Sequence, residues 1–196
     1  MRTRSLRLVS LLAMLLLMGS VAQAQSIKLV APGVGWVAPG GKKILWTSDG
    51  GKDWKNVAPP TPNDLTISKI LFLDSEHGWV LLAYDDYTVG ANFEVARTDD
   101  GGTTWSMQPI EERFSGPMTL SFADPNHGCL GLLGASDGGR TWFSAYKPNT
   151  RKPEELTGCP DTQVTRDFGW TVAGRISDRL YVTRDAGKTW QQVVIP

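Results

Sequence analysis

The chain has 196 residues, with 20 Lys and Arg against 20 Asp and Glu, so its formal charge is zero. This balance argues against a nucleic-acid-binding protein, which usually carries a basic excess. Hydrophobic residues make up 41% and charged residues 20%, which excludes a disordered polymer. With 21 Gly, 12 Pro and 8 Trp, the composition favours an all-β fold with many turns.

The first 24 residues have the features of a secretory signal peptide. Three arginines, at positions 2, 4 and 7, precede an apolar run over 8–18 that only Ser10 interrupts, and Val21-Ala22-Gln23-Ala24 is a small-x-small cleavage pattern. The run is too short to span a bilayer, which takes about 20 residues. We therefore expect cleavage after Ala24 and a secreted or periplasmic protein without a membrane span. Residues 25–196 carry a net charge of −3, since 17 basic residues remain against 20 acidic ones.

The rest of the chain consists of four repeats. One octet recurs as TSDGGKDW at 47–54, TDDGGTTW at 98–105, ASDGGRTW at 135–142 and TRDAGKTW at 183–190. A second motif precedes each octet, as GVGWV at 33–37, FLDSEHGWV at 72–80, FADPNHGCL at 122–130 and RDFGWTV at 166–172. Units of 40–50 residues with this regularity are typical of β-propeller blades, which have about four strands each.

Each repeat predicts four short antiparallel strands. In the second repeat, strands are expected over 65–73, 79–84 and 93–98 and again from 104, with Asp, Asn and Gly in the turns between them. No segment of the mature chain has the pattern of an amphipathic helix. The prediction is one all-β, propeller-like domain over 25–196, with blades at 27–58, 65–110, 117–147 and 162–195.

The octet has a mechanical interpretation. Its Asp accepts hydrogen bonds from backbone N–H groups a few residues on, its Gly supplies a positive φ, and its Trp anchors the hairpin by burying a large ring. A calcium loop is the alternative, but the D-x-[DN]-x-[DN]-G spacing and the distal Glu are missing. We therefore expect no metal and no cofactor. The residues given this structural role are Asp49, Gly51, Trp54, Asp100, Gly102, Trp105, Asp137, Gly139, Trp142, Asp185, Gly187 and Trp190.

These motifs resemble those of a known family. The octets resemble the Asp-box, or BNR repeat, of β-propellers, and their pairing with F-x-D-x-x-H-G-W resembles the propellers of photosystem II stability and assembly factors, over nearly all of 27–196. The resemblance implies a non-catalytic scaffold that holds a protein partner through loops on the propeller faces. Those relatives have more blades. Four repeats leave open a small closed ring, an open arc, or a ring completed by a second copy.

The third and fourth repeats depart from the pattern. Cys129 replaces the Trp of the second motif, and Asp137 follows it by only eight positions, against 13, 21 and 15 in the other repeats. Such a gap does not easily hold two strands and a turn, so we predict a degraded or three-stranded third blade. Ala186 replaces the first Gly of the fourth octet.

Glycosidases must be considered because Asp-boxes also occur in sialidases, and carbohydrate binding or sialidase-like action is the alternative function. Hydrolysis needs two cooperating carboxylates, or a Tyr nucleophile with acidic partners, and sialidases bind their substrate with three arginines. None of the arginines has a recognisable triad context. His77 and His127, the two histidines, occupy the same repeat position and predict turn residues. We expect no catalytic residues.

Three features stay open at this stage. Tyr84, Asp85, Asp86 and Tyr87 form either a partner-contact loop or an ordinary long hairpin turn. Cys129 and Cys159 are either a disulfide or two unpaired small hydrophobic residues. Trp46, outside both motifs, is either an additional core ring or an exposed aromatic contact.

Overall fold

The computed structural model describes residues 26–62, 65–84, 93–111, 118–145, 158–173 and 179–194. Two predicted features, the signal peptide over 1–24 and the segment from Asp85 to Tyr87, lie outside these ranges. All regular structure in the described ranges is β-strand. None of it forms a helix with the length and hydrophobicity that a membrane crossing requires.

The strands form four antiparallel sheets, each with its four strands in chain order. The first contains β1 (Ser26–Ala31), β2 (Val34–Ala38), β3 (Leu45–Thr47) and β4 (Lys55–Asn56). The second contains β5 (Leu65–Phe72), β6 (Gly78–Tyr84), β7 (Phe93–Thr98) and β8 (Ser106–Ile110). The third contains β9 (Leu120–Phe122), β10 (Gly128–Leu130), β11 (Leu133–Ala135) and β12 (Phe143–Ser144). The fourth contains β13 (Thr162–Gln163), β14 (Gly169–Ala173), β15 (Arg179–Thr183) and β16 (Gln191–Val193).

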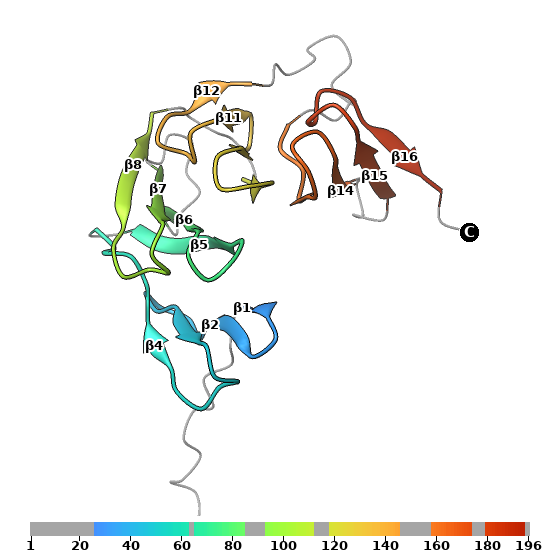
Figure 1. Ribbon diagram of the computed structural model, residues 1–196. Coiled ribbons are helices and arrows are strands. Elements are labelled where there is room, and N and C mark those ends of the chain that lie inside the picture. Colours follow the sequence, from blue (N-terminus) through green and yellow to red (C-terminus); the bar gives the residue numbers. More distant parts are fainter. Residues whose placement is uncertain are drawn as a thin grey trace, which may run out of the picture.

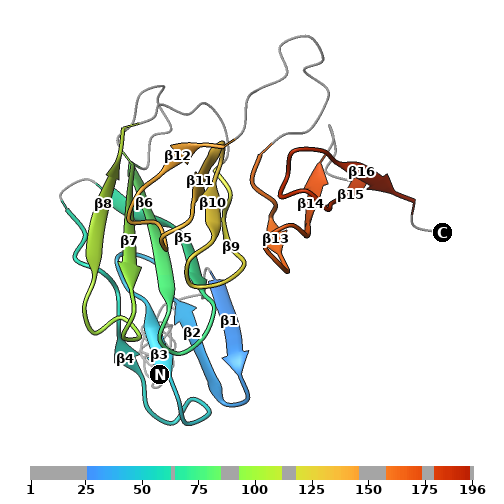
Figure 2. The same ribbon diagram turned by 45° about the horizontal axis from the view of Figure 1, so that its top comes forward.

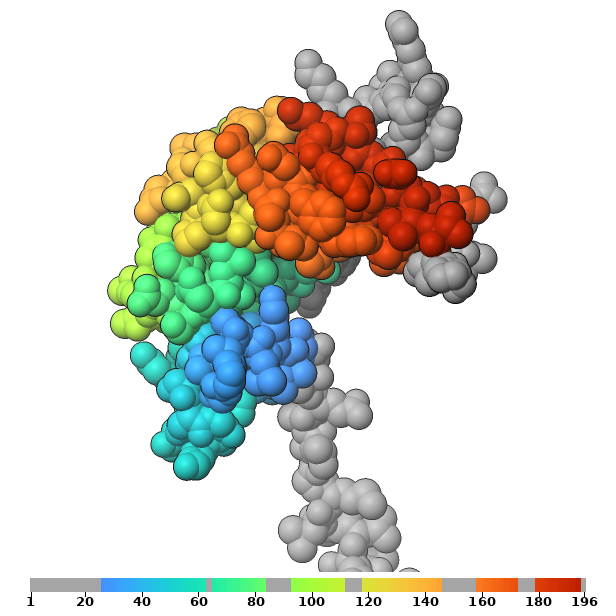
Figure 3. Space-filling model, turned by 45° about the vertical axis from the view of Figure 1, so that its right-hand side comes forward, coloured from blue at the N-terminus to red at the C-terminus, as the bar shows by residue number. Residues whose placement is uncertain are grey.

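The four sheets follow one another around an arc (Figures 1 and 2). Neighbouring sheets meet through their first strands, with β5 beside β9 and β9 beside β13. This arrangement is that of propeller blades around an axis, so the predicted fold class, all-β with four propeller-like blades, is confirmed. The first and fourth sheets lie at the two ends of the arc, and the space-filling view shows a hollow between them (Figure 3).

The third sheet is short but complete, which corrects one part of the prediction. Its strands have only two or three residues each, as expected of a degraded blade. The three-stranded alternative was wrong, because Gly131 and Leu132 alone connect β10 to β11. Gly131 adopts φ +56°, the left-handed conformation that lets a two-residue turn reverse the chain.

The octets form hydrogen-bonded turns that join the third and fourth strands of each sheet. In the second octet the Thr98 hydroxyl donates to Asp100 (2.8 Å) and accepts from the Gly102 N–H (2.8 Å). Asp100 also accepts from the N–H of Thr104 (2.8 Å) and from its hydroxyl (2.6 Å). These bonds, those from Thr104 above all, lower the pKa of Asp100 to about 2. The third octet has Ala135 in place of the first threonine and so lacks that hydroxyl.

The second motif forms a matching turn between the first two strands of a sheet. Asp74 accepts hydrogen bonds from the N–H groups of Glu76 (2.8 Å) and His77 (2.7 Å), and it contacts the His77 ring. Asp124 makes the same contacts with Asn126 and His127. Both histidines are therefore turn residues held by their own aspartates, as their repeat positions predict.

Aromatic stacking joins the second and third sheets. Trp79 is fully buried and lies parallel to Phe122, with ring centroids 3.9 Å apart and planes at 11°. Its ring N–H donates to the Gly138 carbonyl in the third octet (2.8 Å). Trp46 is half-buried against Phe72 of the second sheet, at 5.0 Å. It is therefore a core ring, which settles one of the open alternatives.

One residue with a side chain adopts the left-handed conformation among those described. Ala186 has φ +60°, at the octet position where Gly50, Gly101 and Gly138 have φ between +67° and +80°. This conformation costs an L-residue about 1–2 kcal/mol, whereas the extra chain entropy of glycine costs about 0.4–1 kcal/mol. We expect Ala186→Gly to raise the free energy of unfolding by about 0.5–1 kcal/mol, measured by urea denaturation.

Gly101→Ala is the matched control for that substitution. A Cβ at Gly101 would lie 2.6 Å from the Ser75 carbonyl oxygen, so this variant is expected to be less stable than the wild type. A loss of stability in Ala186→Gly would contradict the assignment of strain to position 186.

Candidate functional site

The junction between the third and fourth sheets differs from the junction before it. Cys129 stands where Trp79 stands in the second sheet, since both follow the glycine that opens the strand. Gln163 pairs with Gly169 just as Phe122 pairs with Gly128, so glutamine occupies the phenylalanine position. The stacked aromatic pair is therefore absent from this junction, and two smaller side chains replace it.

A disulfide and a few hydrogen bonds hold this junction together. Cys129 is bonded to Cys159, with Cα atoms 5.4 Å apart, which resolves the two alternatives that the sequence left open. The Cys159 N–H donates to the Gly131 carbonyl (2.9 Å), and the Gln163 N–H donates to the Ser121 hydroxyl (3.1 Å). The covalent bond thus ties the segment that leads into the fourth sheet to the second strand of the third.

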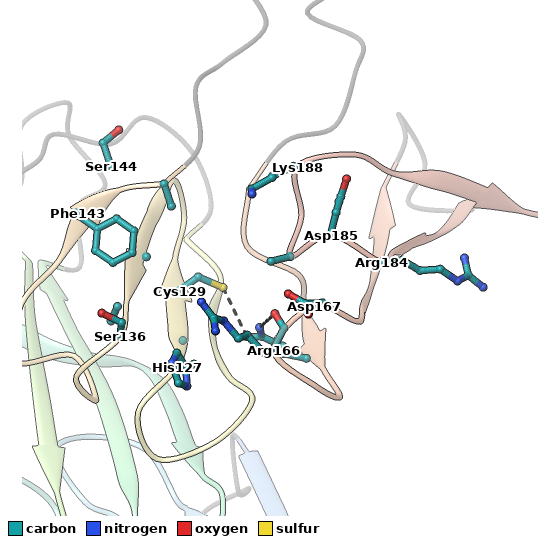
Figure 4. A pocket seen from close by; sticks show the side chains of 16 residues that line it. His127, Cys129, Ser136, Phe143, Ser144, Arg166, Asp167, Arg184, Asp185 and Lys188 are labelled. Carbon is teal, nitrogen blue, oxygen red and sulfur yellow. Dashed lines mark hydrogen bonds between the residues drawn. The ribbon is translucent and has the colours of Figure 1, made fainter.

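A cleft of about 610 Å³ opens at this junction, a volume within the usual range for ligand sites. Its third-sheet wall includes Ala135, Ala145 and Phe143, and Phe143 is 51% exposed. Its fourth-sheet wall includes Arg166 and Lys188. Figure 4 shows Arg166 extending toward the third sheet and Lys188 pointing into the opening. The cleft therefore has apolar side chains beside His127, Ser136 and Ser144 on one wall and two cations opposite them.

The acidic residues of the cleft are not equivalent. Asp167 lies at its edge (Figure 4). Asp185 belongs to the fourth octet, where Thr189 donates its N–H (2.8 Å) and its hydroxyl (2.6 Å) to the carboxylate. Burial raises the pKa of Asp185, but the hydrogen bonds from Thr189 and Thr183 outweigh this effect and hold the pKa below its usual value. Asp185 is thus a charged acceptor committed to its own turn.

Arg184 also belongs to the cleft lining, but its side chain points away from the opening (Figure 4). Its guanidinium lies 5.7 Å from the centroid of the Phe168 ring, a cation–π contact within the fourth sheet. Arg184 therefore contributes less charge to the cleft than Arg166 and Lys188 do.

The structure distributes the octet residues around the arc. Asp185 lines the cleft, as does Cys129 of the disulfide, whereas the aspartates of the first three octets do not. His127 lines the cleft and His77 does not. Across the described ranges, no group of three or more His, Cys, Asp and Glu side chains is placed to hold a metal ion.

Sequence reasoning missed Arg166, Lys188 and Phe143 as a group, because they come from separate turns and strands of two sheets. A signal was nevertheless present. The replacement of the tryptophan by Cys129 indicated an altered junction, and the missing phenylalanine at Gln163 strengthened that signal. Together they predict a gap between neighbouring blades, and the residues around it follow from the repeat register.

Comparisons with known proteins found similarity at the level of the fold. No protein-family model matches the chain, and no curated protein matches it. A solved structure described as "YCF48 bound to D1 peptide" aligns with 88% of this chain and 82% of its own, at 15% identity and a TM-score of 0.47. A second, "YCF48 from Cyanidioschyzon merolae", aligns with 86% and 83%, at 14% identity and a TM-score of 0.31.

Proposed function

We propose that this protein is a non-catalytic binding propeller that holds a protein partner, and that the cleft between the third and fourth sheets is its contact site. The observation that carries the proposal is the replacement of an aromatic stack by an open cleft at one blade junction. The two cations on one wall and the exposed Phe143 on the other fit an extended peptide with an apolar side chain beside a carboxylate.

The carboxylates of the cleft support binding over hydrolysis. A glycosidase needs one carboxyl group that gives up a proton and a second that acts as base or nucleophile. Both carboxylate oxygens of Asp185 accept hydrogen bonds from Thr183 and Thr189 within its own turn, which leaves Asp167 as the other carboxyl group among the described lining residues. No Tyr or Glu lines the cleft within the described residues, and the alternative of a sialidase-like site required them alongside its arginines.

The proposed place of action is outside the cytoplasm, either in the periplasm or in secreted form. The features of residues 1–24 support export. The disulfide between Cys129 and Cys159 fits the same location, since such bonds persist in oxidising compartments.

The experiment that tests this function is selection of peptides from a random display library on the mature protein, followed by titration of the selected peptides. We expect the selected peptides to combine Asp or Glu with a large apolar residue. The double variant Arg166→Glu/Lys188→Glu should weaken their binding by about tenfold or more, because it replaces attraction by repulsion.

Arg140→Glu is the matched control. Arg140 is exposed and lies in the third octet, where it is 3.6 Å from Asp99, and it does not line the cleft. Its reversal should leave peptide affinity within about twofold of the wild type. Equal losses in both variants would contradict the cleft as the site. A glycan array that binds while the peptide library yields nothing would favour the carbohydrate alternative.

A further inference from the structure

Each sheet of the arc has two different faces. The leading face packs on the next sheet and the trailing face packs on the sheet before. In the second sheet, Trp79, Leu81 and Val95 form the leading face in the core shared with the third sheet. Phe72 and Val80 belong to its trailing face, in the core shared with the first sheet. The two faces are complementary because a tryptophan on one meets a phenylalanine on the next, as Trp79 meets Phe122.

The leading face of the fourth sheet has no sheet against it among the described residues. Trp170 stands at the Trp79 position, directly after the glycine that opens the second strand. Trp170 pairs with Val182, and Val172 pairs with Leu180, so these four side chains share that face. Val172 is 51% exposed. Val182 is buried, and Trp170 is half-buried, with its ring edge-on to Phe168 of the same sheet at 5.6 Å. The open part of this face is therefore Val172 and the uncovered part of the Trp170 ring.

The trailing face of the first sheet carries the position that would receive such a tryptophan. Leu29 pairs with Gly35 as Phe72 pairs with Gly78, so Leu29 occupies the position that receives a tryptophan elsewhere. Ile27 lies on the same face. Ile27 is 70% exposed and Leu29 is 72% exposed. Exposed apolar side chains at repeat-equivalent positions mark an interface that lacks its partner.

We propose that a second copy of this chain covers both faces, so that two four-bladed arcs form one eight-bladed ring. The ring of Trp170 in each copy packs against the side chain of Leu29 in the other. The two junctions are identical and related by a two-fold axis along the propeller axis, so the assembly closes with no face left over. This inference does not depend on the proposed function.

The occupant is a second copy for two reasons. The faces match in register because Trp170 and Leu29 hold the repeat positions of Trp79 and Phe122, so the contact continues the junctions already present within the chain. Moreover, a ring leaves β1 and the fourth sheet covered, which removes the exposed apolar ends that an isolated arc retains.

The test is the mass of the mature protein by light scattering coupled to size exclusion, for the wild type and for variants of each face. We expect twice the chain mass for the wild type. Leu29→Glu and Val172→Glu should each weaken self-association by at least about thirtyfold, the factor of an interface hot spot. Trp170→Ala should act in the same direction. Far-UV circular dichroism shows whether each variant remains folded.

A mixing experiment identifies the faces. An equal mixture of Leu29→Glu and Val172→Glu chains should regain a dimer, because each mixed pair has one junction with both wild-type faces. Phe143→Glu, which alters an equally exposed side chain in the cleft, should leave the dimer intact. A monomeric wild type, an open series of larger species, or a dimer lost only in Phe143→Glu would each overturn the proposal.

Discussion

Replacing Trp79 with alanine is expected to lower the free energy of unfolding by about 3–5 kcal/mol, as large-to-small changes at buried aromatic residues do. The ring is fully buried, stacks on Phe122 at 3.9 Å and donates to the Gly138 carbonyl. The substitution therefore removes apolar burial, a ring contact and a buried hydrogen bond at one junction. Urea denaturation followed by far-UV circular dichroism measures the change.

Trp54→Ala is the control for this experiment. Trp54 is the octet tryptophan of the first repeat and not the counterpart of Trp79; it is 44% exposed and donates its ring N–H to the Gly51 carbonyl within the same turn (3.0 Å). Its removal should cost about 1 kcal/mol, because little burial and one exposed hydrogen bond are lost. Equal losses at Trp54 and Trp79 would show that the inter-sheet stack does not dominate stability.

Removing the disulfide is expected to cost about 3–4 kcal/mol, the value of the loop-entropy relation for a separation of 30 residues. The variant is Cys129→Ala/Cys159→Ala. Its effect should be concentrated in the fourth sheet, because the junction it joins lacks the stacked aromatic pair and retains only a few hydrogen bonds. Local opening of that sheet then becomes easier than global unfolding.

Hydrogen exchange distinguishes local from global loss. In the disulfide variant, amides over 162–193 should lose protection while those over 65–110 keep it. A reducing agent should produce the same pattern in the wild type and no further change in the variant. Uniform loss of protection in all four sheets would contradict a fourth sheet held chiefly by the disulfide.

Local hydrogen bonding made the repeats readable from sequence. The Asp100 turn is closed by groups between Thr98 and Thr104, so each octet specifies its hairpin without help from distant residues. The same locality explains why all four sheets could be predicted. It also explains the one error in strand count, since the turn at Gly131 and Leu132 is shorter than the spacing argument allowed.

Contacts between sheets were not predictable in the same way. The Trp79 ring donates to the carbonyl of Gly138, 59 residues later in the chain. No local sequence pattern determines which neighbouring sheet a given ring packs against. The cleft combines Phe143, Arg166 and Lys188 because two sheets are placed side by side at a junction where small side chains replace aromatic ones. The Tyr84–Tyr87 loop stays a prediction, since most of it lies outside the described residues.

The sequence by itself determined the all-β class, the four repeats, the octet turns and the positions of the turn histidines, because each depends on hydrogen bonds and φ angles within a few residues. Only the tertiary structure decided that Cys129 pairs with Cys159, that the third and fourth sheets enclose a cleft, and that the four sheets form an arc with two exposed ends. These features depend on how neighbouring sheets pack, and packing is set by distances between residues that are far apart in the chain.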